Sequence, residues 1–312
     1  MNVLVTGGAG FIGSHVAEAY LRRGDRVVVL DDLRRGRRDQ VPAGAELVVA
    51  DIASPEAAEL LRRGHFDIWN HHAAQVNVRH SVADPRDDAR TNIDGLLNLL
   101  QAAVDAGVRR VLFASSGGAI YGEAEQRPTP ETARKVPESP YGVSKLAGEH
   151  YLFAYHRLYG LDYVALRYSN VYGPRQDPEG EAGVIAIFGD RLCRGLPLEV
   201  FGDGEQTRDY IYVADVVAAN LVLTEAALPP AAAVDDRAFN VGTGRETTVN
   251  QLAAWARRRV PDAHVRHSRP RPGEVRHSAL DAAKLRALGW APCVALEDGL
   301  EVTWAWLQGQ RS

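Results

Sequence analysis

The chain has 312 residues, of which 46% are hydrophobic and 24% are charged, and its formal net charge is -4 at pH 7. This length and composition allow a large buried core, and the slight negative charge argues against a nucleic-acid-binding surface. No apolar stretch approaches the roughly 20 residues needed to cross a membrane. Cys193 and Cys293 lie far apart, without the spacing of a zinc site or a disulfide framework, so we expect reduced thiols and no metal.

The N-terminus enters a strand pattern at once, at residues 2–6. No basic region, longer apolar segment and small-residue cleavage site comes before it, which is the order found in export signals. We therefore expect a cytoplasmic protein.

The first half of the chain alternates short apolar runs with helical patterns. This alternation predicts a parallel sheet covered by helices on both faces, and the continuous apolar run at 27–30 is typical of a buried parallel strand. The predicted fold class is α/β, a Rossmann-type doubly wound parallel sheet with a smaller interleaved C-terminal substrate-binding region. We expect strands at 3–6, 26–30, 46–49, 66–70, 111–114 and 163–167, and helices at 12–23, after residue 54, at 91–106 and at 141–158.

A glycine pattern follows the first expected strand and opens the first expected helix. Gly8, Gly10 and Gly13 have the spacing G-x-G-x-x-G. Glycines at these positions permit a tight turn, close approach of the backbone to a pyrophosphate, and packing of the helix on the strand. The helix N-terminus then attracts the phosphates. The pattern predicts a dinucleotide site.

Acidic residues after the second and third strands bear on the choice of dinucleotide. Asp31 ends the second strand, where it can accept hydrogen bonds from an adenosine ribose and repel a 2′-phosphate. NAD is therefore expected rather than NADP, although the nearby Arg34, Arg35 and Arg37 weaken this preference. Asp51 and Ile52 follow the third strand and are expected beside the adenine, unless Asp51 is only an acidic residue near a helix N-terminus.

A tyrosine and a lysine share one face of the expected helix at 141–158. Tyr141 and Lys145 are at positions i and i+4, so the ammonium can favour the phenolate, and the tyrosine can accept a proton near neutral pH. The simpler alternative is a lysine stem that covers the ring. Lysine is rare here, because Lys135, Lys145 and Lys284 are the only lysines among 36 basic residues, which favours a specific role for Lys145.

The amino-acid composition changes after Asn170, where loops rich in glycine, proline and charged residues begin. Such loops are more typical of binding loops than of linkers. We expect residues 1–173 to form the NAD-binding domain, with its sheet completed by about 237–260. Residues 174–236 and 261–312 are expected to form mainly the smaller nucleotide-sugar-binding region.

These motifs together resemble the extended short-chain dehydrogenase/reductase family, and within it the UDP-glucose 4-epimerase group, over nearly the whole chain. The motifs that carry the resemblance are Thr6-Gly-Gly-Ala-Gly-Phe-Ile-Gly-Ser-His15, Asp31-Asp32-Leu33, His72-Ala-Ala74, Asn92, Ser115-Ser-Gly-Gly-Ala-Ile-Tyr-Gly122, Tyr141-x-x-x-Lys145, Arg167-Tyr-Ser-Asn-Val-Tyr-Gly-Pro174, Arg208-Asp-Tyr-Ile-Tyr-Val213 and Arg271-Pro-Gly-Glu274.

The resemblance implies an isomerase that holds NAD and inverts C4 of a UDP-hexose, such as UDP-glucose or UDP-galactose, through a 4-keto sugar. It implies that Tyr141 is the base and that Lys145 holds the nicotinamide ribose and lowers the tyrosine pKa. It also implies a homodimer in which the helices near 91–106 and 141–158 pair with their mates. The implied cofactor-binding residues are Gly7, Gly10, Phe11, Ile12, Gly13, Asp31, Asp32, Asp51, Ile52, Ala73, Ala74, Asn92, Tyr141, Lys145 and Tyr168.

The expected catalytic hydroxyl departs from the family pattern. It usually lies four positions before the tyrosine of the Tyr121-Gly122 pair, and here that position is Gly117. The double glycine suggests one extra residue in the loop, so Ser116 is the predicted hydroxyl and Ser115 the alternative. Either serine could instead only satisfy backbone groups at the strand end.

The implied substrate-binding residues are Ser116, Asn170, Arg208, Arg271, Glu274 and Ser278. Arginines suit a diphosphate, because guanidinium groups pair bidentately with phosphate oxygens. Position 278 borders the C2 substituent in the resembling enzymes, where a tyrosine excludes an N-acetyl group. The small Ser278 predicts that UDP-GlcNAc and UDP-GalNAc are also accepted, unless another side chain closes the pocket.

Several other functions remain open. A nucleotide-sugar dehydratase, decarboxylase or uronate epimerase of the same family would begin with the same oxidation, but the related dehydratases carry Asp-Glu in the loop that here reads Gly-Gly-Ala-Ile at 117–120. A non-catalytic NAD-sensing regulator would not need Tyr141, Lys145 and Ser116 together. The pair His71-His72 is interpreted as strand-end packing, because no third metal ligand is evident.

Overall fold

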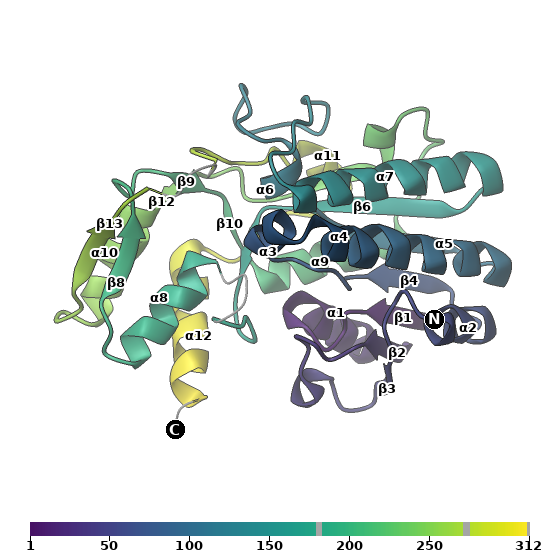
Figure 1. Ribbon diagram of the computed structural model, residues 1–312, viewed down its shortest axis with the longest axis horizontal. Coiled ribbons are helices and arrows are strands. Elements are labelled where there is room, and N and C mark those ends of the chain that lie inside the picture. Colours follow the sequence, from purple (N-terminus) through teal and green to yellow (C-terminus); the bar gives the residue numbers. More distant parts are fainter. Residues whose placement is uncertain (179–182, 271–274, 311–312) are drawn as a thin grey trace.

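A seven-stranded sheet forms the centre of the computed structural model, which describes residues 1–178, 183–270 and 275–310 (Figure 1). All neighbouring strands are parallel, in the order β11-β6-β5-β4-β1-β2-β3. The order reverses between β1 and β4, which creates the crevice where such sheets bind dinucleotides. The strands are β1 Asn2–Thr6, β2 Arg26–Asp31, β3 Glu46–Val49, β4 Ile68–His71, β5 Arg110–Ser116, β6 Asp162–Tyr168 and β11 Ala238–Val241.

Helices cover both faces of this sheet, as the alternating sequence predicted. Successive residues of β2 enter different cores, with Val28 in the core under α2, α5 and α7 and with Val27 and Val29 in the core under α1 and α9. This placement explains the unbroken apolar run of β2. The helices are α1 Phe11–Arg22, α2 Pro55–Arg63, α5 Gly95–Ala106, α7 Pro140–Tyr159, α9 Val213–Glu225 and the short α11 Ala283–Arg286.

The helix expected at 91–106 begins with a π-helical turn, and two short helices precede it. Short helices α3 Val78–Ala83 and α4 Pro85–Ala89 are followed by a π-helical turn, Arg90–Asp94, before α5 begins. The helical pattern is continuous across this junction, so periodicity alone does not reveal the wider turn. The π turn contains the buried Asn92, and such turns often occur at functional sites.

Caps in the sequence explain where α7 begins and ends. Ser139 precedes the helix and its hydroxyl accepts the N–H of Gly142 at 3.1 Å, while Pro140 occupies the first turn. The helix ends at Gly160, whose φ of 72° suits glycine. These signals place Tyr141 in the first turn of α7.

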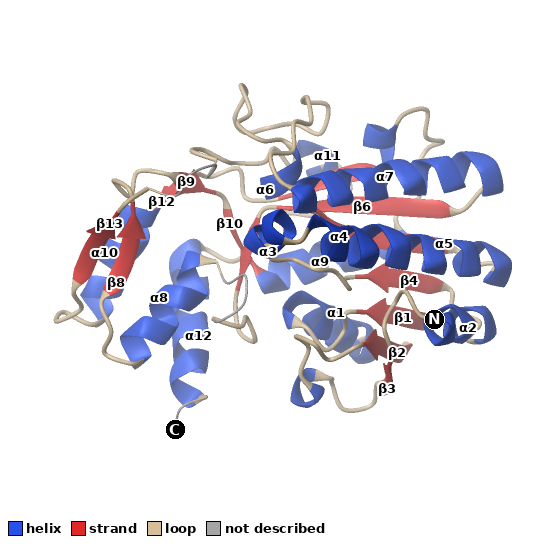
Figure 2. Cartoon of the chain, in the orientation of Figure 1, coloured by secondary structure: helices blue, strands red, loops and turns tan. Residues whose placement is uncertain are grey.

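A second core lies beyond the carboxyl edge of the sheet (Figure 2). It is formed by three helices and a parallel strand pair, β8 with β13, and two further strand pairs join it to the sheet domain. The helices are α8 Val184–Cys193, α10 Val249–Arg259 and α12 Leu296–Gly309. The strands are β8 Leu198–Phe201 and β13 Val265–Ser268, with the pairs β7 Asn170–Tyr172 and β10 Tyr210–Tyr212, and β9 Thr207–Arg208 and β12 Thr247–Thr248.

The packing corrects the expected domain division in two places. Helix α9 was expected in the smaller region, but it packs on α1 and the central sheet. Helix α10 was expected to complete the sheet domain, but its buried residues join α8 in the second core. Both helices can bury an apolar face against either core, so the local pattern does not assign them. Within the described residues, no helix is both long enough and apolar enough to span a membrane.

Candidate active site

The loop between β1 and α1 packs too closely on neighbouring backbone to accept side chains at Gly7 and Gly13. A Cβ on Gly13 would lie 2.2 Å from the Gly7 carbonyl oxygen, and a Cβ on Gly7 would lie 2.5 Å from the backbone nitrogen of Ala73. Gly7 also has a φ of 73°, which favours glycine. In the described structure, no side chain caps the N-terminus of α1 at Gly10 and no acidic residue lies in its first turn. The N–H groups there suit an anion such as a pyrophosphate.

Asp31 lies at the end of β2, close to the glycine loop. Its carboxylate accepts the N–H of Ala9 at 3.0 Å and the N–H of Leu33 at 2.9 Å. Burial raises the pKa of Asp31, while the two N–H groups oppose this shift. Asp32 is more exposed and pairs with Arg34. Asp31 therefore ties the second strand to the phosphate loop, beside the position expected for the adenosine ribose.

The first turns of α7 hold Tyr141 and Lys145 on one face. The Lys145 ammonium donates to the carbonyl of Ala114 on β5 at 2.8 Å and lies 5.9 Å from the centre of the Tyr141 ring. Burial lowers the pKa of Lys145 to about 8, with Asp88 acting in the opposite direction. The lysine thus presents a poorly solvated charge near the tyrosine, as the motif predicted.

Polar contacts join the π turn to the start of α7. The Asn92 amide donates to the Ser144 hydroxyl at 3.2 Å, and that hydroxyl donates to the Tyr141 carbonyl at 2.9 Å. Asn92 also exchanges hydrogen bonds with the backbone of Gln75, at 2.8 and 2.9 Å. Asn92 is therefore positioned to hold both Tyr141 and the segment after β4 in place. Its side-chain amide makes hydrogen bonds to Gln75 and Ser144.

The two candidate serines have different surroundings at the end of β5. Ser115 is 3% exposed, and its hydroxyl donates to the buried Glu149 carboxylate at 2.5 Å. Ser116 is the last residue of β5 and the N-cap of α6 Gly117–Ile120; it is partly exposed and makes no side-chain capping bond within the described chain. A Cβ on Gly117 would lie 2.5 Å from the end of the Leu280 side chain, so a side chain at the position usual for the hydroxyl would require Leu280 to shift.

The α6 turn approaches the N-terminus of α7 closely. A Cβ on Gly142 would lie 2.5 Å from the carbonyl oxygen of Ala119. Gly142 follows Tyr141 directly, and α6 begins after Ser116. The fold thus brings the tyrosine, the lysine and the serine turn to one edge of the sheet.

The structure shows the surroundings of four further residues that were predicted to bind the cofactor, Ile52, Ala73, Ala74 and Tyr168. Ala73 and Ala74 follow β4, where the His72 N–H pairs with the Thr6 carbonyl at 2.8 Å. Ile52 is buried against Gly95. Tyr168, however, is 6% exposed, and its hydroxyl accepts from Asn220 at 2.9 Å. Its ring stacks on that of His72, so it supports the crevice rather than offering a free hydroxyl.

Asn170, Arg208 and Ser278, three of the predicted substrate residues, lie on segments that contact one another. Asn170 begins β7, and its N–H pairs with the Asp209 carbonyl at 2.9 Å. Arg208 lies on β9, and the backbone of the residue before Ser278 bridges to Thr207. The structure therefore places Asn170, Arg208 and Ser278 on segments that are joined by these backbone contacts. Arg271 and Glu274 lie outside the described residues.

Asp209 is a residue of this region that the sequence analysis missed. It is fully buried, and its carboxylate accepts N–H groups from Thr243, Gly244 and Leu280 at 2.9, 3.0 and 3.1 Å. Burial raises its pKa, and these hydrogen bonds oppose that shift. Asp209 therefore joins the strand of Arg208 to the segment that follows Ser278. Its position directly after the predicted substrate residue Arg208 is the feature of the sequence that could have indicated its importance.

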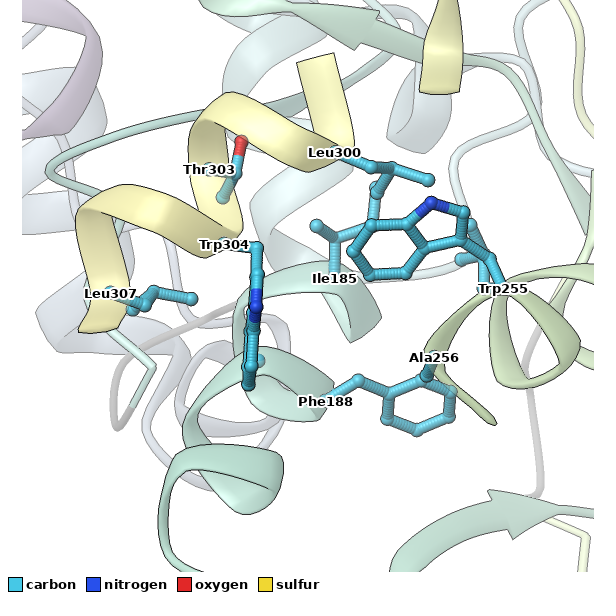
Figure 3. A pocket seen from close by; sticks show the side chains of 10 residues that line it. Ile185, Phe188, Trp255, Ala256, Leu300, Thr303, Trp304 and Leu307 are labelled. Carbon is cyan, nitrogen blue, oxygen red and sulfur yellow. The ribbon is translucent and has the colours of Figure 1, made fainter. Parts of the chain in front are cut away.

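The described residues contain no group of three or more histidines, cysteines or carboxylates arranged to hold a metal. Burial lowers the pKa of His72 to about 3, so this histidine is neutral in the folded protein. An apolar pocket lies elsewhere, between α8, α10 and α12, where Trp255 and Trp304 line it with Phe188 and Leu300 (Figure 3). That pocket belongs to the second core and holds none of the predicted catalytic residues.

Known proteins resemble this chain over nearly its full length. The sequence model of the NAD dependent epimerase/dehydratase family matches residues 3–242. UDP-glucose 4-epimerase of Mycolicibacterium smegmatis is 44% identical, over 97% of both chains. The crystal structure of UDP-glucose 4-epimerase from Thermotoga maritima with UDP-glucose has a TM-score of 0.95 and 46% identity, with 100% of both chains covered. That of the Thermus thermophilus enzyme in complex with NAD has a TM-score of 0.92 and 43% identity, with 99% of both chains covered. The predicted family and fold are confirmed, and the chain belongs to the NAD-dependent epimerase/dehydratase family.

Proposed function

We propose that the protein catalyses the reversible, NAD-dependent C4 epimerisation of a UDP-hexose. The observation that carries this proposal is the meeting of Tyr141, Lys145 and the Ser116 turn at the edge of the sheet where the glycine loop opens. The relatives named above are UDP-glucose 4-epimerases over their full length, which supports the same reaction here.

The residues present fit an NAD molecule in the crevice. The uncapped N-terminus of α1 suits the pyrophosphate, and the glycines at 7, 10 and 13 permit the tight turn that leads into this helix. Asp31 would accept hydrogen bonds from the adenosine ribose, and Lys145 keeps donors beyond its bond to Ala114 for the nicotinamide ribose. Bound NAD would supply the acceptor of the C4 hydride and its return to the other face of the sugar.

The chain's own residues would handle the proton and hold the sugar. Tyr141 takes the proton from O4, helped by the positive charge of Lys145, which favours the phenolate. Ser116 donates a hydrogen bond to O4, where negative charge develops during oxidation. After the 4-keto sugar turns over within the site, the same tyrosine returns the proton.

The remaining substrate residues suit a nucleotide diphosphate. Asn170, Arg208 and Ser278 lie on segments that are joined by backbone contacts, which supports a shared role in binding. Arg208 would pair with the diphosphate, and Arg271 and Glu274 are proposed from the family motif alone. Ser278 would border the substituent on C2.

The loop before Tyr121 argues for epimerisation over dehydration. Residues 117–120 read Gly-Gly-Ala-Ile, so they supply no carboxylate to act at C5 and C6. A side chain at position 117 would also require Leu280 to shift. A dehydratase remains the second candidate, and its 4-keto-6-deoxy product would identify it.

The decisive experiment is incubation of the protein with UDP-glucose and UDP-galactose, followed by chromatographic separation of the C4 epimers. We expect each sugar to give the same equilibrium mixture. Tyr141→Phe is the matched control, because it removes the proton acceptor with little loss of volume; it should retain bound NAD and form no epimer. An inert wild-type protein, or an active Tyr141→Phe variant, would reject this assignment.

A further inference from the structure

A fully buried ion pair lies directly behind the serine turn. Glu149, on α7, and Arg167, on β6, are both 0% exposed in their side chains. The guanidinium donates to the carboxylate through Nη2 at 2.6 Å and through Nε at 3.0 Å. Glu149 lies one turn beyond Lys145, on the same face of the helix as Tyr141.

This ion pair is bonded to both ends of the serine turn. At one end, the Ser115 hydroxyl donates to Glu149 at 2.5 Å. At the other end, Arg167 donates through Nη1 to the Tyr121 hydroxyl at 2.9 Å. Only residues 116–120 lie between these two attachment points.

The attachments also fix the turn relative to α7 and the rest of the sheet. Lys145 donates to Ala114, the residue before Ser115, so α7 is bonded to two consecutive residues of β5. The Tyr121 hydroxyl donates onward to Asn240 on β11 at 2.8 Å. The helix that carries Tyr141 and the turn that carries Ser116 are therefore both held by hydrogen bonds to the same buried ion pair.

Stability alone is a weak explanation for such an arrangement. Removing two charges from water carries a penalty that their attraction often fails to exceed, and buried ion pairs can frequently be replaced by apolar residues without loss of stability. The turn itself has a small core, in which Ile120 and Tyr121 pack on Leu280. Hydrogen bonds have defined directions, so the bonds at Ser115 and Tyr121 can fix the orientation of the backbone between these two residues. The small apolar cluster cannot do this.

We propose that Glu149, Arg167, Ser115 and Tyr121 form a positioning clamp that holds the Ser116 hydroxyl at its working distance from Tyr141. The clamp residues act through the turn and do not touch the substrate. This inference rests on the proposed epimerase function. Because a displacement of about 1 Å can lower turnover by about 10²-fold, loosening either end of the turn is expected to affect kcat strongly.

The test uses one variant at each end, Ser115→Ala and Tyr121→Phe, each of which removes a hydroxyl and leaves the ion pair intact. In both variants we expect kcat for UDP-galactose to fall by about 10- to 100-fold while KM and bound NAD are unchanged. Amide hydrogen exchange, measured by mass spectrometry, should be faster across 116–120 than in the wild type. The double variant should lose less than the product of the single effects, because both act on one turn.

Tyr20→Phe is the matched control. Tyr20 is also fully buried, and its hydroxyl accepts from Asn70 at 3.1 Å, in the opposite core under α1. The control should lower thermal stability without changing kcat or exchange at 116–120.

Unchanged exchange in both variants would overturn the clamp, as would a normal kcat. A loss of kcat in Ser115→Ala alone would identify Ser115 as the substrate hydroxyl and would also overturn it. Absence of epimerisation by the wild type would reject the proposed function, and the exchange measurement would then still decide whether the clamp holds the turn.

Discussion

Ser116 and Ser115 differ in what their hydroxyls can reach. Ser115 is committed to Glu149, whereas Ser116 is partly exposed at the start of α6. We expect Ser116→Ala to lower kcat by about 10²–10³, the loss typical when one donor to a developing oxyanion is removed. Thermal stability should be nearly unchanged, because a partly exposed hydroxyl is removed. Steady-state kinetics and a thermal melt check both parts, and wild-type turnover in this variant would exclude Ser116 as the donor.

Ser278 bears on the range of substrates. A small side chain leaves room for an N-acetyl group on C2, whereas a packed pocket cannot absorb several extra heavy atoms without strain. We expect the wild type to interconvert UDP-GlcNAc and UDP-GalNAc as well as UDP-glucose and UDP-galactose. Ser278→Tyr should remove only the N-acetyl activity, and the size-matched Ser278→Ala should retain both. A wild type that turns over no N-acetyl sugar contradicts this prediction.

At the scale of elements, the contact between α6 and α7 sets the geometry of the site. A Cβ on Gly142 would lie 2.5 Å from the Ala119 carbonyl and 3.0 Å from the Pro137 side chain. The Ala119 carbonyl can move away from such a Cβ only if the whole turn moves. Overpacking of this kind typically lowers the free energy of unfolding by about 1–3 kcal/mol.

We therefore expect Gly142→Ala to lower both the thermal midpoint and kcat, the latter by about 10-fold or more because the Ser116 turn is displaced. Gly309→Ala in α12 is the matched control, because its Cβ would meet no atom within 4 Å. Circular dichroism melts and initial rates measure both effects. Equal behaviour of the two variants would show that the α6–α7 contact does not position the site.

At the scale of the whole molecule, the outer face of α7 carries exposed apolar side chains that nothing in the described part of the chain buries. Val143, Tyr151 and Leu158 lie along one stripe of this helix, and they are 52%, 39% and 72% exposed. An apolar stripe on a helix of a globular protein normally faces a core or a partner. We propose that α5 and α7 pair with the same helices of a second copy, as the family resemblance implied.

Light scattering at micromolar concentration should give the mass of a dimer. The double variant Tyr151→Glu and Leu158→Glu should shift the protein to a monomer, because charges on the stripe oppose its burial. Val302→Glu on α12 is the control, since Val302 is 50% exposed outside the stripe and its replacement should leave the dimer intact. A wild-type monomer would refute the predicted assembly.

The sequence by itself determined the alternating fold, the glycine loop and the Tyr141–Lys145 pair. These features depend on residues close in the chain, where apolar periodicity, caps and glycines act directly on the local backbone. The same reasoning reached the family, because the motifs keep their spacing over nearly the whole chain.

Only the tertiary structure decided which serine is bonded to Glu149, where α9 and α10 pack, and how the serine turn is held. Ser115 is occupied because folding brings Glu149 from α7 against β5, and Arg167 reaches Tyr121 from the next strand. The sequence could not predict where α9 packs for a similar reason, because an apolar helix can be buried in either core. These contacts join segments distant in the chain, and local periodicity carries no information about which distant segment a buried face will meet.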